Sequence, residues 1–219
     1  MISILPNIIF TFLLIISVGF FSLNIRKLIK VIKLGKAVDR FDNPSKRLSN
    51  MIMIALGQSK MLNKPISGIL HLIVYIGFII INIEVLEIII DGITGSHRFF
   101  SKIFNTYIYN FLIASFEILA LLVLISVIVF WSRRNIVKIK RFLSAEMKGW
   151  PKFDADNILY FEVILMLLFL SMNATDLILQ ERNYYNYYSA GSFPISTFLV
   201  PLFDSLSTSS VYYLERIFW

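Results

Sequence analysis

Four long apolar segments constrain this 219-residue chain more than any other feature of its sequence. They cover about residues 2–23, 66–90, 107–131 and 158–179. A bilayer hydrocarbon core of roughly 30 Å is crossed by about 20 apolar residues in a helix, and each segment reaches that length. The sequence therefore predicts an all-α integral membrane protein, a bundle of four transmembrane helices within one membrane domain, residues 1–219.

A shorter apolar stretch begins at about Val211 and runs to Trp219 as "VYYLERIFW". It holds fewer than half of the residues that a helix needs to cross a bilayer. We expect either an interfacial tail or the first turns of an incomplete fifth helix.

The basic residues indicate how the spans are oriented. Seventeen of the 21 Lys and Arg residues lie in the connections after the first and third segments, and the periodic basic stretch after residue 23 is expected to continue the first helix. Positively charged loops face the cytoplasm, so the N-terminus should lie outside a multi-pass protein of the cell's inner (cytoplasmic) membrane. The net charge of +7 then reflects contact with lipid, and we expect no nucleic-acid partner.

The chain contains no cysteine. This excludes disulfides, catalytic thiolates and cysteine-held iron–sulfur clusters within it. The spans also lack the paired Pro and Gly breaks of many transporters, which makes transport a weaker hypothesis.

Ionisable side chains inside a membrane span cost roughly 2.5 to 3.5 kcal/mol each, so every one of them is a candidate functional group. Helical geometry places Glu84, Glu87 and Asp91 on one face of the second segment, near its outer end. These acids hydrate the helix end or, together with Glu117 of the third segment, form a proton path or the wall of a quinone pocket. The fourth segment is interrupted by further polar residues, namely Glu162, Asn173 and Asp176.

The two histidines have different expected settings. His71 lies near the cytoplasmic end of the second segment, on the face opposite the acids. Its imidazole either bonds to a neighbouring helix or serves as an axial ligand of haem iron, which would make it the metal ligand. His97, in the glycine-flanked loop "TGSHRFF", is expected to be solvated or interfacial.

Several stretches resemble the N-terminal membrane domain of heterodisulfide-reductase-related (Fe–S)-binding oxidoreductases, which is similar to the cytochrome b gamma subunit of respiratory nitrate reductase. They are "ALGQSKMLNKPISGILHLIVYIGF", "INIEVLEIIIDGITGSHR", "FEILALLVLISVIVFWSRRNIVKIKRF" and "EMKGWPKFDADNILYFEVILM". The resemblance covers nearly the whole chain and stops at the start of the fifth helix. The Fe–S domain of the family is absent from this sequence.

The resemblance implies a membrane subunit that passes electrons between menaquinone or another quinone and a cytoplasmic iron–sulfur protein. It implies b-type haem with His71 as one axial ligand, and a partner or missing C-terminal part that carries the iron–sulfur clusters. Met61 stands where the nitrate reductase subunit has a second histidine. On this reading the chain is an oxidoreductase component that is inactive in isolation, and the alternative is a cofactor-free membrane anchor for a soluble redox enzyme.

Overall fold

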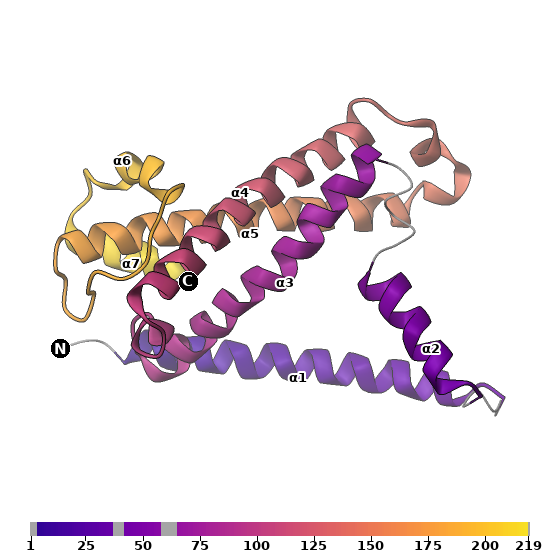
Figure 1. The fold of residues 1–219 in the computed structure, drawn as a ribbon, viewed down its shortest axis with the longest axis horizontal. Coiled ribbons are helices and arrows are strands. Elements are labelled where there is room, and N and C mark those ends of the chain that lie inside the picture. Colours follow the sequence, from indigo (N-terminus) through magenta and orange to yellow (C-terminus); the bar gives the residue numbers. More distant parts are fainter. Residues whose placement is uncertain (1–3, 37–41, 58–64, 219) are drawn as a thin grey trace. The chain divides into compact units, whose positions relative to one another are not determined.

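The computed structural model describes residues 4–36, 42–57 and 65–218, and within those ranges the regular elements are all helices. Four of them are long and apolar enough to cross a membrane, which confirms the all-α membrane fold (Figure 1). These four are α1 (Leu5–Lys33), α3 (Pro65–Thr94), α4 (Thr106–Asn135) and α5 (Trp150–Glu181).

Shorter helices connect and follow the long ones (Figure 1). Helix α2 (Pro44–Met51) continues into one π-helical turn, η1 (Ile52–Leu56), and 3₁₀ turns occur in the later loops. Helix α7 (Thr208–Phe218) takes up the C-terminal apolar stretch. The remaining short elements are η2 (Phe99–Lys102), η3 (Lys140–Leu143), η4 (Ala145–Met147), η5 (Ser196–Phe198) and α6 (Val200–Phe203).

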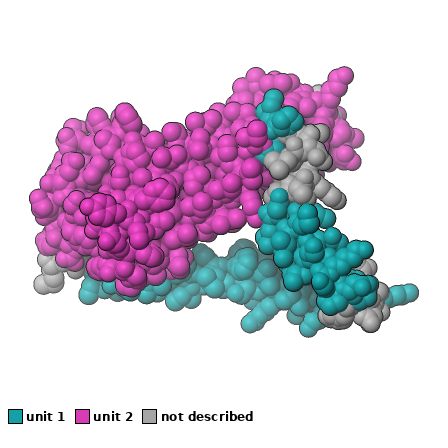
Figure 2. Space-filling view, viewed as in Figure 1, with its two compact units in different colours: residues 1–68, 92–95 teal, residues 69–91, 96–219 magenta. Residues whose placement is uncertain are grey.

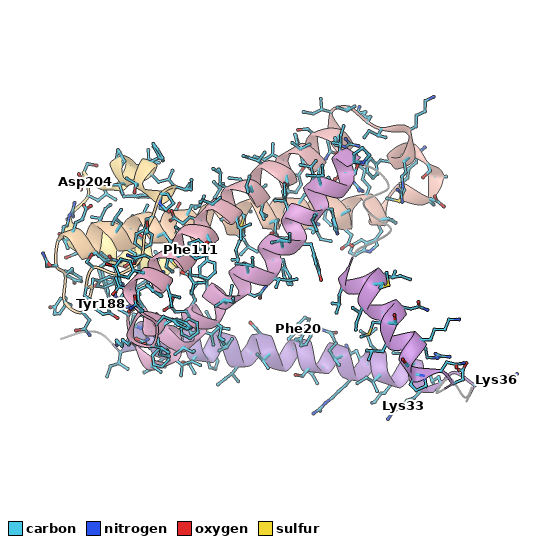
Figure 3. The ribbon with its side chains drawn as sticks, viewed as in Figure 1. Phe20, Lys33, Lys36, Phe111, Tyr188 and Asp204 are labelled. Carbon is cyan, nitrogen blue, oxygen red and sulfur yellow. The ribbon has the colours of Figure 1, made fainter. Side chains whose placement is uncertain are left out.

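The chain divides into two compact units, residues 1–68 with 92–95 and residues 69–91 with 96–219 (Figure 2). In the first unit α1 exposes apolar side chains along its whole length, such as Phe20 in Figure 3. Lipid is the natural environment of such a surface. The helix continues past its apolar segment to Lys33. The positive charges of the lysines in its last turn interact favourably with the negative, C-terminal end of the helix dipole.

The second unit has an apolar core in which α5 packs against both α4 and α7. Helix α3 contributes Ile81, and α4 contributes a row of buried residues at helical spacing. The row consists of Tyr109, Ile113, Phe116, Ala120, Val123 and Val127.

Residues at the two ends of a short loop stop α3 and start α4. Gly95 has a φ of +72°, a left-handed conformation that glycine adopts without steric cost, and it ends α3. The side chain of Asn105 accepts a hydrogen bond from the Tyr107 N–H at 2.9 Å and caps α4. The connection between two long helices is therefore only about ten residues long, and it holds His97 and Arg98 at their ends.

The close approach of α3 and α4 at Gly77 provides a test of this packing. A Cβ atom at Gly77 would lie 2.5 Å from Cγ2 of Val123, a β-branched side chain with restricted χ1 rotation. A Cβ atom at Gly19 of α1 would meet no other atom within 4 Å. We expect Gly77→Leu to lower the free energy of unfolding by about 1–3 kcal/mol through overpacking, and Gly19→Leu to leave it unchanged or raise it. Thermal unfolding in detergent checks this, and equal effects of the two changes would contradict the packing.

Candidate functional site

Arg98 lies at the centre of a buried polar cluster at one end of the second unit, with 5% of the residue exposed. Its Nη1 donates to Oε1 of Glu84 at 2.6 Å, and its Nε donates to Oδ2 of Asp176 at 2.8 Å. Its Nη2 donates to Oδ1 of Asn173 at 2.8 Å. The guanidinium thus joins α3 to α5 through charge-assisted hydrogen bonds, which are stronger than bonds between neutral groups.

Arg98 also has an unusual backbone conformation and an aromatic ring beside its guanidinium. Arg98 has a φ of 51°, a left-handed conformation that is uncommon outside glycine, and its guanidinium lies 5.1 Å from the ring centroid of Phe193. Burial opposes the charge, but Asp176 and the neighbouring carboxylates outweigh burial and hold the pKa of Arg98 well above its usual range. Arg98 is therefore a permanent buried cation.

The next two acids of α3 hold the backbone of the loop that follows them. Glu87 accepts hydrogen bonds from the Phe100 N–H at 2.6 Å and from the Tyr109 hydroxyl at 2.9 Å. Asp91 accepts from the Phe99 N–H at 3.2 Å and from the Ser96 hydroxyl. Both carboxyl groups thus cap η2 at the end of α3.

His97 contacts the same cluster from the loop. Its Nε2 lies 2.7 Å from Oδ1 of Asp176, and its ring packs beside Tyr187 and Tyr188 with centroid distances of 4.5 Å and 5.1 Å. The Tyr188 hydroxyl, labelled in Figure 3, donates to the backbone carbonyl of His97 at 2.6 Å. We expected His97 to be solvated or interfacial. Its side chain is only 10% exposed, so the ring is not solvated, and its interfacial position stays a prediction. Its partners come from segments about 80 to 90 residues away, which the loop sequence does not reveal.

Glu117 extends the cluster into α4. One carboxylate oxygen accepts from Nδ2 of Asn173 at 3.2 Å, and the other accepts from the N–H groups of Ile195 and Ser196 at 2.8 Å and 3.1 Å. Asn173 therefore bridges Arg98 and Glu117. The carboxylate holds the start of η5 and has both oxygens occupied.

Helix α7 adds one more buried acid. Burial raises the pKa of the Glu215 carboxyl above its usual range, although the neighbouring Arg216 opposes this shift. Burial also raises the pKa of Tyr187, whose hydroxyl donates to Oε2 of Glu215 at 3.0 Å. This hydrogen bond connects the tyrosine-rich loop to α7.

Two adjacent spaces border the cluster. A cavity of about 30 Å³ is lined by Glu84, Glu87, Ile88, Asp91, Ser96, His97, Arg98, Met172, Asp176, Glu215 and Arg216. A wider pocket of about 310 Å³ is lined by Ser96, His97, Lys102, Tyr185, Asn186, Tyr187 and Tyr188. Ser96 and His97 line both spaces, so the loop between α3 and α4 forms the wall between them.

The structure thus brings Glu84, Glu87, Asp91 and Glu117 into one connected cluster. Sequence reasoning did not identify the centre of this cluster, Arg98. Two polar residues in the fourth apolar segment, Asn173 and Asp176, were the sequence signal for the part of the cluster on α5. They lie three residues apart and so share a helix face.

His71 lies apart from this cluster. It is half-buried, thirteen residues before Glu84, which is about 20 Å along a helix. No residue that the structure describes forms a hydrogen bond with its ring. The other histidine is engaged with Asp176, Met61 lies outside the described residues, and the described part of the chain contains no cluster of three metal-binding side chains. These residues therefore fit one axial position of a haem and not a complete two-histidine site.

Removing the central cation tests the cluster. Arg98→Met should lower the free energy of unfolding by about 3–5 kcal/mol, because it leaves buried carboxylates without their counter-charge. The same change at the exposed Lys102, in the same loop, should cost about 0.5 kcal/mol or less.

The pH dependence has a defined sign. The Arg98→Met defect should shrink as pH falls, because protonation neutralises the unpaired carboxylates, and should grow as pH rises. Thermal unfolding of both variants across a pH series measures this. A similar, pH-independent loss for Lys102→Met would contradict the central role of Arg98.

No family model matches this sequence, and no curated protein or solved structure is similar enough to it to count as a match. The function is therefore inferred from the arrangement of the side chains.

Proposed function

We propose that this chain is the membrane component of a quinone-linked electron-transfer oxidoreductase, with the quinone headgroup bound in the 310 Å³ pocket. The observation that carries the proposal is the adjacency of that pocket to a buried cluster of carboxyl groups, across a wall formed by Ser96 and His97. Oxidation of a quinol releases protons together with electrons. A site of this kind needs proton acceptors beside the ring, and the cluster supplies them.

The pocket has the chemistry that a planar, polar ring requires. Its volume falls at the lower end of the range for small-molecule sites. The rings of Tyr185, Tyr187 and Tyr188 offer flat apolar surfaces with polar tips, and Lys102 supplies a cation whose Nζ lies 6.0 Å from the Tyr188 ring centroid. A quinone oxygen is a hydrogen-bond acceptor, so Lys102 and the Tyr185 hydroxyl suit it. The hydroxyls of Tyr187 and Tyr188 already donate to Glu215 and to the His97 carbonyl.

His71 is the one residue of this chain that we propose as a haem ligand. A bound b-type haem would supply one-electron transfer between the quinone and an iron–sulfur protein. His71 would hold the iron on one side, and the second ligand would come from outside the described residues. The basic loops, which we propose face the cytoplasm with the N-terminus outside, would receive the iron–sulfur partner.

A cofactor-free anchor for a soluble redox enzyme is the competing proposal. The hydrogen bonding of Glu87 and Glu117 favours it, because both carboxyl groups are occupied in holding loops. On that view the cluster is purely structural. Ligand binding separates the two proposals.

Quinone binding is the first test. A short-chain menaquinone analogue, titrated against the chain in lipid nanodiscs by calorimetry, should bind about tenfold more weakly to Tyr185→Ala, a loss of about 1.4 kcal/mol. Tyr107→Ala is the matched control, because Tyr107 is exposed at the start of α4 and does not line the pocket. The quinone proposal fails if the wild type does not bind the analogue or if the two variants bind equally.

Haem ligation is the second test. Reduced-minus-oxidised visible spectra of the chain, expressed with the iron–sulfur partner, should show a b-type signal that His71→Ala abolishes. His97→Ala should retain it, because that ring belongs to the separate cluster. An unchanged spectrum in His71→Ala would rule out His71 as a ligand, and absence of any signal would favour the anchor.

A further inference from the structure

The 30 Å³ cavity has a polar lining and the size of about one water molecule. Buried waters in proteins typically bridge polar groups that lack a protein partner. A water in this cavity would bond to polar side-chain atoms around it that lack a protein partner.

In the described part of the chain, three side chains that line the cavity have a buried polar atom with no hydrogen bond, and in one of them, Arg216, that atom is in an ion pair with Glu215 at 3.4 Å. The other two are Glu84 and His97. Oε2 of Glu84 and Nδ1 of His97 are both buried, and neither has a hydrogen-bond partner among the residues that the structure describes. Glu84 is 1% exposed, and the side chain of His97 is 10% exposed. Leaving either atom without a partner is unfavourable, and more so if the group is charged.

The other atoms of these two side chains are engaged. Oε1 of Glu84 accepts from Nη1 of Arg98, and Nε2 of His97 lies against Oδ1 of Asp176. An ionised Asp176, held by Arg98, makes Nε2 the protonated nitrogen of the neutral ring. Nδ1 is then a hydrogen-bond acceptor, and Oε2 is an acceptor when Glu84 is ionised and a donor when it is neutral.

Charged and titratable groups face His97 from every element around it. Its own loop contributes Arg98, and the loop after α5 contributes Tyr187 and Tyr188. The remaining groups that line the two spaces come from α3 (Glu84, Glu87, Asp91), α5 (Asp176), α7 (Glu215, Arg216), η2 (Lys102) and the segment after α5 (Tyr185). Acids outnumber permanent cations around the cavity, so an additional proton there is favoured.

We propose that a water molecule in this cavity joins Nδ1 of His97 to Oε2 of Glu84, and that the pair holds one exchangeable proton. In one state the proton is on Glu84 and the imidazole is neutral. In transfer, the Oε2–H bond breaks as a bond forms to the water, and one O–H bond of the water breaks as Nδ1–H forms. The products are a Glu84 carboxylate and a His97 imidazolium, and no electrons move.

The neighbouring groups stabilise both states. Arg98 bonds to Glu84 and Asp176 at the same time, so it compensates the carboxylate of Glu84 whenever the proton leaves it. Asp176 compensates the imidazolium. His97 also lines the 310 Å³ pocket, so the pair lies where protons can exchange with solvent. This inference requires neither quinone nor haem.

The chain contains only two histidines, so selective ¹⁵N labelling resolves both rings. We expect the ¹⁵N ring signals of His97, in nanodiscs across a pH series, to show the Nε2–H tautomer in the neutral state. Glu84→Gln should move the pH midpoint of its protonation downward by about one pH unit, a tenfold loss of proton affinity, because the neighbouring carboxylate is gone. The signals of His71 should not change, and His71→Gln assigns them.

Ser126→Ala is the matched control, because it removes another buried atom without a partner, Oγ of Ser126, which does not line the cavity. It should leave the titration of His97 unchanged. An unchanged His97 midpoint in folded Glu84→Gln would overturn the proposal, as would an equal shift in Ser126→Ala.

A measurement on the wild type covers the case in which Glu84→Gln does not fold. Infrared spectra in D₂O should show a protonated carboxyl band that changes over the same pH range as the His97 ring signals. A carboxyl band that titrates independently of His97, or the absence of such a band, would also overturn the proposal.

Discussion

Arg98 and its buried counter-charges are the constraint on which the rest of the second unit depends. A guanidinium cannot be buried at the end of membrane helices without acceptors for its N–H groups, and the acids of α3 cannot be buried without a cation. Glu84, Asn173 and Asp176 meet that requirement together. The loop after α3 is thereby held against α5, and His97 is carried into the interior with it.

The residues of the cluster differ in how fully their polar atoms are hydrogen-bonded. Glu87 and Glu117 have their oxygens occupied by hydrogen-bond donors of the loops and of α4 and α5. Glu84 and His97 each keep one buried atom without a partner among the residues that the structure describes, and such an atom is open to a hydrogen bond with water. His71 lies about 20 Å farther along α3, so any electron-transfer role at His71 would be separate from the proton-binding cluster.

Sequence reasoning succeeded where the physical cause is local. The four spans follow from apolar length alone, and the common face of Glu84, Glu87 and Asp91 follows from helical geometry. It did not reveal that the His97 ring is buried, because a glycine-flanked loop with an arginine has the composition of a solvated or interfacial turn. The partners that bury it, Asp176 and Tyr188, come from α5 and from the loop after it.

The sequence by itself therefore determined the membrane class, the approximate positions of the four long helices and the presence of acids on one face of α3, but not the helix limits, since α5 begins at Trp150 and not at about residue 158. It could not determine which groups neutralise those acids, because ion pairing in a low-dielectric interior depends on distances of a few ångströms between segments distant in the chain. Only the tertiary structure decided that Arg98 is the shared partner. It also decided that His97 and Glu84 line one small cavity, because that cavity exists only where α3, α5, α7 and the loop between α3 and α4 meet.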